Sequence, residues 1–254
     1  MLESDRDGHV VTLRFADPQR RNALGYAQVA ELVAALREAA DDDQVRAVVL
    51  TGSGTAFSAG GDLNEFRREL KGSALELYDS GAVWAELFTL VPRLRLPLIA
   101  AVNGPALGGG CGIVALCDLA IASREATFAL SEIRIGLFPI VVLPALRRVV
   151  GERVARQMAL TGDQLDAAEA QRVGLVNRVV EPAALQAEAA DLAARLARLG
   201  PTALGLGKRL LADTAGLDYD EAVGHAQAMR GVFLTNPELV EGVAAFLDKR
   251  PPQW

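Results

Sequence analysis

Two glycine-rich segments decide the fold of this chain: Ala56-Phe57-Ser58-Ala59-Gly60-Gly61-Asp62 and Asn103-Gly104-Pro105-Ala106-Leu107-Gly108-Gly109-Gly110-Cys111-Gly112. Each segment follows an apolar run and precedes a helical pattern, so each can direct backbone N–H groups from the start of a helix toward one point. Close packing of backbone against backbone is the alternative explanation for either turn alone. Because two turns of the same kind lie about one supersecondary unit apart, we expect them to form an oxyanion hole together.

The composition is that of an α/β enzyme with a large buried core. The chain has 254 residues, of which 51% are hydrophobic and 23% charged, and its net charge is −6. This charge, without any block of Lys and Arg, argues against a nucleic acid as the main partner. Cys111 and Cys117 point to different faces of an expected helix, so we expect neither a disulfide nor a metal site.

Targeting and membrane segments are not apparent in the sequence. The stretch from Met1 to Asp7 is charged where a signal peptide would be apolar. No apolar run approaches the roughly twenty residues that a bilayer span needs. We therefore expect a cytoplasmic protein.

The order of the expected elements also indicates an α/β fold. Strands are expected at Val10–Phe15, Ala47–Leu50, Leu98–Val102, Leu119–Ala122 and Val176–Val180. Helices are expected from the turn at Asn22 to Ala40, and at Leu63–Leu70, Ser73–Val91, Cys111–Cys117, Arg147–Leu160, Asp166–Val173, Ala183–Leu199, Pro201–Ala212, Tyr219–Leu234 and Pro237–Leu247. We expect an α/β core over residues 1–195 and a C-terminal helical region over residues 196–254.

Common nucleotide-binding and hydrolase motifs do not fit the two glycine turns. Gly110 stands where a P-loop would have its lysine, and Phe57 and Ile113 stand where a dinucleotide fingerprint would have its third glycine. No candidate serine lies in a nucleophile elbow, and the only two histidines are near opposite ends of the chain. Asp62 and Asp118 are expected to be helix caps or turn formers.

Glu132 is the candidate acid of the sequence. If residues 128–136 form a strand, period-two alternation places its carboxylate on the same face as Phe128 and Leu130. A carboxylate on such a face is costly unless it is paired. Glu132 therefore either pairs with a cation such as Arg134, or lies in a cleft with a raised pKa suited to proton transfer. The residues alone leave both alternatives open.

With these residues assembled, the chain resembles the enoyl-CoA hydratase/isomerase (crotonase) superfamily over nearly its whole length. The matching segments occur in the family's order, and they are Arg20–Leu24, Ala47–Gly52, Ala56–Leu63, Ala101–Gly104, Gly108–Gly110, Cys117–Ala122, Leu160–Gly162, Ala167–Ala170, Gly174–Asn177 and Phe246–Arg250. The superfamily hosts several reactions on one frame, so this resemblance indicates the fold more strongly than the reaction.

The resemblance implies a crotonase-like spiral of ββα units with a C-terminal helical trimerisation region, assembled as a homotrimer or as a homohexamer made of two trimers. It assigns the oxyanion hole to the N–H groups of Gly61 and Gly109, which would hold the thioester oxygen of an acyl-CoA as it becomes an enolate. In a cleft that excludes water, one such donor lowers the barrier by roughly 3 kcal/mol.

The resemblance also implies a binding site for coenzyme A and a pocket for the acyl group. The residues expected around CoA are Arg20, Arg21, Ser58, Ala59, Gly60, Asp62, Phe246 and Lys249, the last two from this chain or a neighbouring one. The residues expected around the acyl group are Phe66, Leu87, Phe138 and Val141. The substrate would be carried as a CoA thioester, and no prosthetic group is expected.

The chain departs from part of the family in its acids. Hydratases with two catalytic glutamates carry one of them two residues after the triple glycine, where this chain has Gly112, so that only Glu132 remains. A single carboxylate suits proton shuttling between the α- and γ-carbons, as in isomerases of the superfamily. The segment from Glu132 to Pro139 is nevertheless similar to single-glutamate members that are usually classed as hydratases.

Three functions therefore remain, in order of preference. The first is an enoyl-CoA hydratase, which adds water across the double bond of a 2-enoyl-CoA. The second is an isomerase that moves the double bond from the β,γ to the α,β position with Glu132 as its proton shuttle. The third is a non-catalytic acyl-CoA-binding protein, a hypothesis motivated by the missing acid at Gly112.

Overall fold

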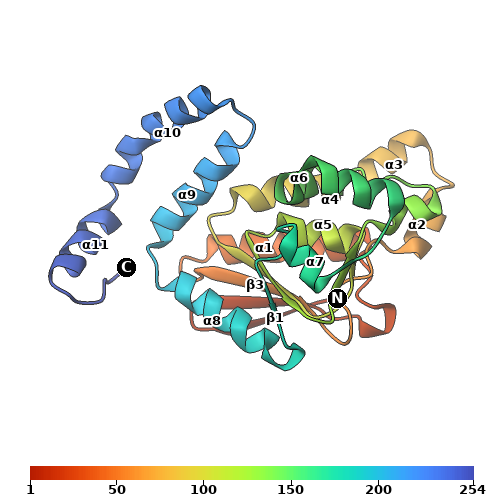
Figure 1. The fold of residues 1–254 in the computed structure, drawn as a ribbon, viewed down its shortest axis with the longest axis horizontal. Coiled ribbons are helices and arrows are strands. Elements are labelled where there is room, and N and C mark those ends of the chain that lie inside the picture. Colours follow the sequence, from red (N-terminus) through yellow and green to blue (C-terminus); the bar gives the residue numbers. More distant parts are fainter.

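A six-stranded sheet forms the centre of the structure, a computed structural model that describes residues 1–254 (Figure 1). In sheet order its strands are β1 (Leu2–Asp7), β2 (Val10–Phe15), β3 (Ala47–Gly52), β4 (Leu98–Val102), β6 (Leu119–Ser123) and β9 (Arg178–Val180). Only β1 is antiparallel to its neighbour. A smaller sheet contains β5 (Ala106–Leu107), β7 (Thr127–Ala129) and β8 (Leu165–Asp166).

Eleven α-helices accompany the sheets. They are α1 (Tyr26–Asp41), α2 (Leu63–Glu69), α3 (Ala74–Ser80), α4 (Ala82–Leu90), α5 (Gly109–Leu116), α6 (Val142–Thr161), α7 (Ala167–Arg172), α8 (Leu185–Ala197), α9 (Pro201–Thr214), α10 (Tyr219–Leu234) and α11 (Pro237–Leu247). Four short 3₁₀ helices are η1 (Pro18–Arg20), η2 (Val91–Arg93), η3 (Ser131–Ile135) and η4 (Pro182–Ala184). No helix is both long and apolar enough to cross a membrane.

The sheet is covered on both faces, which explains its sequence pattern. Strands β3 and β4 are buried at every residue, as expected for central parallel strands that read as continuous apolar runs. The main core lies between one face of the sheet and helices α1, α4, α5 and α6. Helix α8 covers the other face through Leu185, Ala189 and Ala193. The predicted α/β body is therefore confirmed.

The C-terminal helices α9, α10 and α11 extend away from this body, on the side opposite α2 and α3 (Figure 1). Helix α9 is attached through Lys208, whose side chain is only 9% exposed. Its Nζ donates to the carbonyl of Leu96 (2.8 Å) and to Oδ2 of Asp118 (2.6 Å), which also accepts a bond from the N–H of Leu98. Asp118 thus anchors α9 to the body, in addition to lying in the turn between α5 and β6.

The structure differs from the sequence-based expectations in three places, each for a local reason. The charged N-terminus forms β1, an exposed edge strand whose polar side chains hide the usual apolar alternation. The helix expected over Ser73–Val91 is divided into α3 and α4 at Gly81, which ends one and begins the other. The strand considered for residues 128–136 ends at Ala129, because its partners β5 and β8 are each two residues long.

Candidate active site

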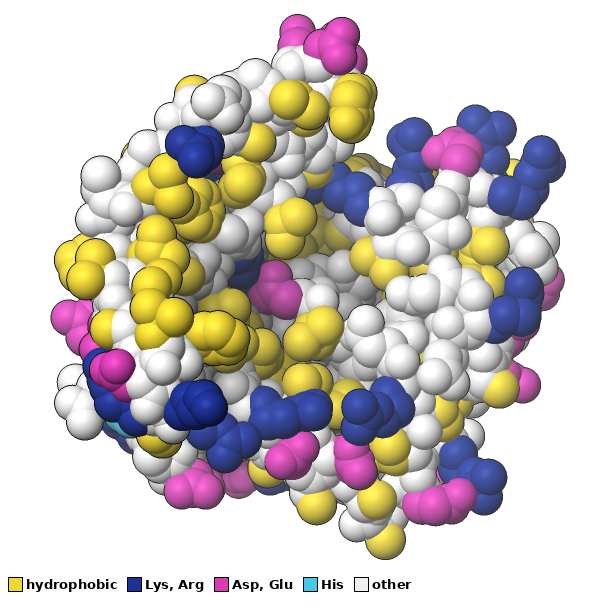
Figure 2. All heavy atoms as spheres, turned by 60° about the vertical axis from the view of Figure 1, so that its left-hand side comes forward, with side chains coloured by type: hydrophobic (Ala, Val, Ile, Leu, Met, Phe, Trp, Pro, Cys, Tyr) yellow, Lys and Arg dark blue, Asp and Glu magenta, His cyan; other side chains and the backbone are white.

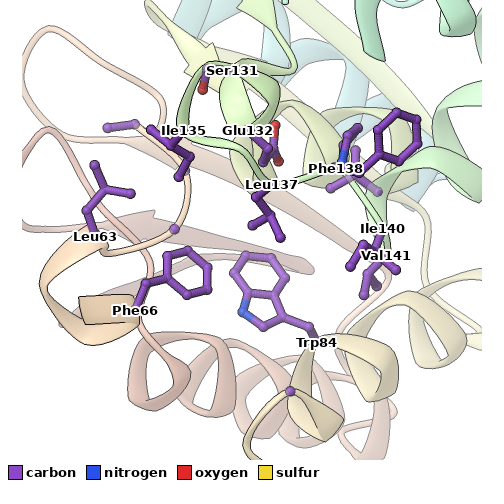
Figure 3. A pocket seen from close by; sticks show the side chains of 18 of the residues that line it. Leu63, Phe66, Trp84, Ser131, Glu132, Ile135, Leu137, Phe138, Ile140 and Val141 are labelled. Carbon is purple, nitrogen blue, oxygen red and sulfur yellow. The ribbon is translucent and has the colours of Figure 1, made fainter. Parts of the chain in front are cut away.

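A cavity of about 490 Å³ lies between the two glycine turns and the residues before α6 (Figure 3). In Figure 3, Leu63 and Phe66 of α2 lie on one side of it, Ile140 and Val141 on the other, and Trp84 of α4 below. Glu132 points in from η3, opposite the indole. Among the predicted site residues, those that line the cavity are Ala59, Gly60, Gly61, Phe66, Gly109, Glu132, Phe138 and Val141.

Hydrogen bonds from the side chain of Asn22 hold the first glycine turn in place. This side chain is 1% exposed, and its Nδ2 donates to the carbonyls of Ser53 (2.9 Å) and Ala56 (2.8 Å). Ser58 Oγ donates to the carbonyl of Asn22 (2.8 Å) and accepts the N–H of Gly60 (3.1 Å). The N–H of Gly61, at the cavity, forms no hydrogen bond within the chain. It is therefore available to a ligand.

The second turn places the start of α5 at the same cavity. Gly108 has φ 51° and ψ −121°, a backbone conformation that only glycine adopts freely. The following residues, Gly109 and Gly110, begin α5, where backbone N–H groups have no partner inside the helix. Helix-start donors also carry the positive end of the helix dipole, so this position stabilises negative charge.

The two turns lie directly against each other. The N–H of Leu107 donates to the carbonyl of Ser58 (2.9 Å). A Cβ atom built on Gly60 would be 2.6 Å from the carbonyl oxygen of Leu107 and 3.4 Å from the backbone nitrogen of Gly109. The predicted neighbouring arrangement of the turns is thus present, with both Gly61 and Gly109 on one cavity.

Glu132 lies in η3 and not in a strand, and its carboxylate faces Gly108. A Cβ atom on Gly108 would be 2.9 Å from Oε1 of Glu132, so a side chain at position 108 would collide with the acid. Oε2 of Glu132 is buried and accepts no hydrogen bond from the chain. Burial raises the pKa of this carboxyl above its ordinary value.

The alternative of a structural ion pair for Glu132 is wrong. Arg134, its expected partner, donates from Nη2 to the carbonyl of Gly162 (2.8 Å). An unpaired, partly buried carboxylate beside two free backbone donors is an arrangement suited to proton transfer next to a developing oxyanion. This is the second of the two alternatives that the sequence left open.

Aromatic rings cover the two glycines that carry the donors. A Cβ atom on Gly61 would be 2.7 Å from Cε2 of Phe66, and one on Gly109 would be 2.6 Å from Cη2 of Trp84. The cavity wall near the donors is therefore apolar, which strengthens hydrogen bonds to an anion. Trp84 was not predicted, because an aromatic residue in an apolar helix is typical of a core position.

Leu87 is not a pocket residue, contrary to the prediction. Its side chain is 1% exposed and belongs to the main core under the sheet-facing side of α4. Trp84, three residues earlier, is the residue of α4 that reaches the cavity. The helix exists where the sequence indicated, but its rotation about its own axis was not predictable from an almost uniformly apolar segment.

The residues expected to contact CoA are dispersed. Ser58 is 0% exposed, so it braces the first turn and cannot contact a ligand, which corrects the prediction. Asp62 caps α2, as predicted, by accepting the N–H of Asn64 (2.9 Å). Arg20 pairs with Asp62 (2.9 Å) and with Asp17, whereas Arg21 is exposed and forms no ion pair within the chain.

Phe246 and Lys249 do not line the cavity of their own chain. Phe246 lies in the last turn of α11 and Lys249 just after this helix, on the far side of the molecule from α2 and α3 (Figure 1). The side chain of Phe246 is 83% exposed. If these residues close a CoA site, that site belongs to a neighbouring copy.

Gly112, the position of the second acid in two-glutamate hydratases, is enclosed by apolar side chains. A Cβ atom there would be 2.7 Å from Cγ2 of Val142 and 2.9 Å from Cζ of Phe88. No space for a carboxylate exists at this position. Glu132 is the only acidic residue that lines the cavity, and no group of three or more His, Cys, Asp and Glu side chains in the chain could hold a metal ion.

Comparison with known proteins agrees with this geometry. The model of the family described as enoyl-CoA hydratase/isomerase matches residues 5–254. A crotonyl-CoA hydratase of Syntrophomonas wolfei is 35% identical over 97% of this chain and 94% of its own length. A short-chain-enoyl-CoA hydratase of Clostridium acetobutylicum is 34% identical over the same shares.

Solved structures give the same result. The crystal structure of an enoyl-CoA hydratase of Mycobacterium smegmatis superposes with a TM-score of 0.94 and 41% identity, over 100% of this chain and 98% of that one. Sequence and fold therefore agree with these relatives over nearly the full length of the chain. The chain belongs to the enoyl-CoA hydratase/isomerase family.

Proposed function

We propose that this protein is an enoyl-CoA hydratase, which adds water across the double bond of a 2-enoyl-CoA. The observation that carries the proposal is that Gly61, Gly109 and Glu132 line one cavity, with the Glu132 carboxylate unpaired. Two backbone donors suit a thioester oxygen that gains negative charge, and the acid suits water activation. The names of the relatives support the same reaction.

The proposed reaction needs no more than these groups. The Glu132 carboxylate takes a proton from water as the water oxygen bonds to the β-carbon of the substrate. The electrons of the double bond move toward the thioester, whose oxygen becomes an enolate oxyanion held by the N–H groups of Gly61 and Gly109. The protonated Glu132 then returns the proton to the α-carbon, which regenerates the carboxylate and the carbonyl.

We propose that the acyl group is carried as a CoA thioester and that no prosthetic group takes part. Arg21, exposed and without an ion-pair partner, and Arg20 are placed beside the first turn, where they can approach the phosphates. Two free cysteines and the absence of any membrane-spanning helix are compatible with the expected cytoplasmic location, which stays a proposal.

Isomerisation is the second candidate, and Gly112 is the observation that favours it. With no carboxyl possible at that position, Glu132 would be the only proton carrier between the α- and γ-carbons. The two reactions are separated by supplying 2-enoyl-CoA and 3-enoyl-CoA in parallel and weighing the products. We expect the 2-enoyl substrate to gain the mass of water; an unchanged 2-enoyl substrate together with conversion of the 3-enoyl isomer would replace the proposal by isomerisation.

Glu132→Gln is the matching test of the mechanism. We expect turnover to fall by a factor on the order of 10² to 10⁴, because the amide cannot accept the proton of water. Binding of a saturated acyl-CoA, measured by calorimetry, is expected to stay within about threefold of the wild type. Glu125→Gln, at an exposed acid of the same size, serves as the control; equal activity of both variants would remove Glu132 from the mechanism.

We also propose that the protein assembles as a trimer or as a dimer of trimers. Figure 2 shows apolar side chains gathered over the C-terminal helices, beside a hollow that separates them from the body. On helices α9 and α11, Leu211, Val240, Phe246 and Leu247 are each more than two thirds exposed in the single chain. Soluble monomers rarely leave such a contiguous apolar surface uncovered, and a second copy of the chain is its proposed partner.

A further inference from the structure

A second cavity of about 520 Å³ lies next to the first one. It is bounded by the outer part of α4, the end of α5 and the first turns of α6, and Ala212 of α9 contributes to its far side. Eight of its 13 lining residues are hydrophobic. Val141 lines both cavities, so the two are neighbours.

Val142 and Phe88 lie between the two cavities. Val142 lines the first cavity, and Phe88 lines the second. Both converge over Gly112, since a Cβ atom there would be 2.7 Å from Cγ2 of Val142 and 2.9 Å from Cζ of Phe88. Trp84 packs against Phe88 on the same helix, with ring centroids 6.5 Å apart. Val142 and Phe88 therefore fill the space beside Gly112, which lies in the first turn of α5.

The orientation of a bound acyl group follows from the donors and the acid. With its thioester oxygen on the amides of Gly61 and Gly109 and its β-carbon beside Glu132, the remaining carbons continue deeper into the first cavity. Val142 is 5% exposed and bounds that cavity next to Val141, so a growing chain meets this wall. A channel that ends on packed side chains excludes the longer members of a homologous series.

We propose that Val142, backed by Phe88, sets the upper limit of acyl length by separating the first cavity from the second, which opens toward solvent on its other side. The inference rests on the proposed function and deepens it, because it makes short enoyl-CoAs the substrate class. Reducing the wall joins the two cavities and gives a longer acyl chain further, largely apolar surface to contact. Position 112 contributes by being glycine, since any side chain there would displace Val142 and Phe88.

The test compares Val142→Ala with the wild type on trans-2-butenoyl-CoA and trans-2-decenoyl-CoA. We expect the wild type to prefer the four-carbon substrate, and the ratio of kcat/KM for ten over four carbons to rise about tenfold in the variant. Val149→Ala is the matched control: it removes the same atoms from the same helix and enlarges the second cavity without opening the wall. Its ratio is expected to equal that of the wild type.

Two further measurements keep the inference separate from stability and from the proposed reaction. If Val142→Ala does not fold, as judged by thermal unfolding, Phe88→Leu opens the same wall. Dissociation constants of butyryl-CoA and decanoyl-CoA, measured by calorimetry, report acyl length without any turnover, so they remain informative even if hydration is not observed. An unchanged ten-to-four ratio in a folded wall variant, or a wild type that accepts both lengths equally, would overturn the inference.

Discussion

At the scale of single residues, the site depends on the lack of a hydrogen-bond donor at Oε2 of Glu132. Its Oε2 is buried without a donor, and its Oε1 lies against Gly108, so the ionised carboxyl is poorly solvated. Burial raises the pKa of this group. An acid whose pKa is higher in the folded than in the unfolded state weakens the fold wherever it is ionised.

This coupling predicts a pH-dependent difference in stability between Glu132→Gln and the wild type. At neutral pH the glutamine variant should be the more stable protein, because it does not bury a charge. As pH falls through the raised pKa, the folded wild type takes up its proton first, so the difference should shrink and vanish below the ordinary glutamate pKa of about 4.3. Melting temperatures across pH 4 to 8 check this. A difference independent of pH would contradict it, and Glu125→Gln provides the baseline.

Gly112 is a second residue whose neighbours leave no room for a side chain. Gly112→Ala would place a methyl group 2.7 Å from Cγ2 of Val142, an overpacking that costs roughly 1 to 3 kcal/mol of unfolding free energy. Urea denaturation measures the loss. The control is Gly207→Ala in α9, where a Cβ atom meets nothing within 4 Å, and no loss is expected. Equal stability of the two variants would mean that Val142 and Phe88 yield without cost.

At the scale of elements, helix α2 is held in place by two of its own acids. Oε2 of Glu65 accepts the N–H of Tyr26 (2.8 Å) at the start of α1, and Oε2 of Glu69 accepts the hydroxyl of Tyr26 (2.6 Å). Burial and the bond to Glu69 raise the pKa of Tyr26 to about 12, so its hydroxyl remains a donor throughout the neutral range. Because α2 begins beside Gly61 and carries Phe66, these bonds also position the cavity wall.

Tyr26→Phe removes one of these bonds and leaves the other intact. We expect KM for an enoyl-CoA to rise about three- to tenfold, since a hydrogen bond contributes roughly 1 kcal/mol, while kcat changes by less than twofold. Tyr78→Phe, at a residue of α3 that is 79% exposed, is the control. A fall in kcat without a change in KM would instead indicate that the hydroxyl acts on the reacting atoms.

Elements with a strong local pattern could be predicted from the sequence, and those decided by distant partners could not. The apolar runs of β3 and β4 and the two glycine turns can be recognised in the sequence. Burial on both faces of a strand and close approach of two backbones each allow only a few residue types. The segment around Glu132 alternates apolar and polar residues like a strand. It becomes η3 because no neighbouring strand continues beyond Ala129 to pair with it.

At the scale of the whole molecule, the body and the C-terminal helices differ in how far they bury their own side chains. The body encloses its own core, whereas α9 to α11 contribute few buried residues (Figure 1). They are tied to the body at Lys208 and at the carbonyl of Trp254, which accepts a hydrogen bond from Arg46. The helices themselves could be predicted from their apolar periodicity. Their direction away from the body could not, because a sequence does not say whether an apolar face meets its own chain or another copy.

Val240→Asp tests what covers that face. Val240 is 71% exposed on α11, and a carboxylate there would be buried unpaired in an interface between copies. We expect the mass in solution, measured by light scattering, to fall from three or six chains to one. Leu160→Asp, at a residue of the body that is 64% exposed, is expected to keep the assembly. A wild type that is already a monomer would refute the proposed trimer.

The placement of aromatic rings over Gly61 and Gly109 has a practical consequence for anyone who dissects this enzyme by mutagenesis. Replacing either glycine by alanine pushes a methyl group into Phe66 or Trp84 and leaves the amide in place. A conventional scan would therefore record a steric defect and would not test the proposed role of the two backbone donors. Semisynthetic exchange of a single amide for an ester at each position replaces the N–H by an oxygen without adding a side chain, so it tests the hydrogen-bond donor itself.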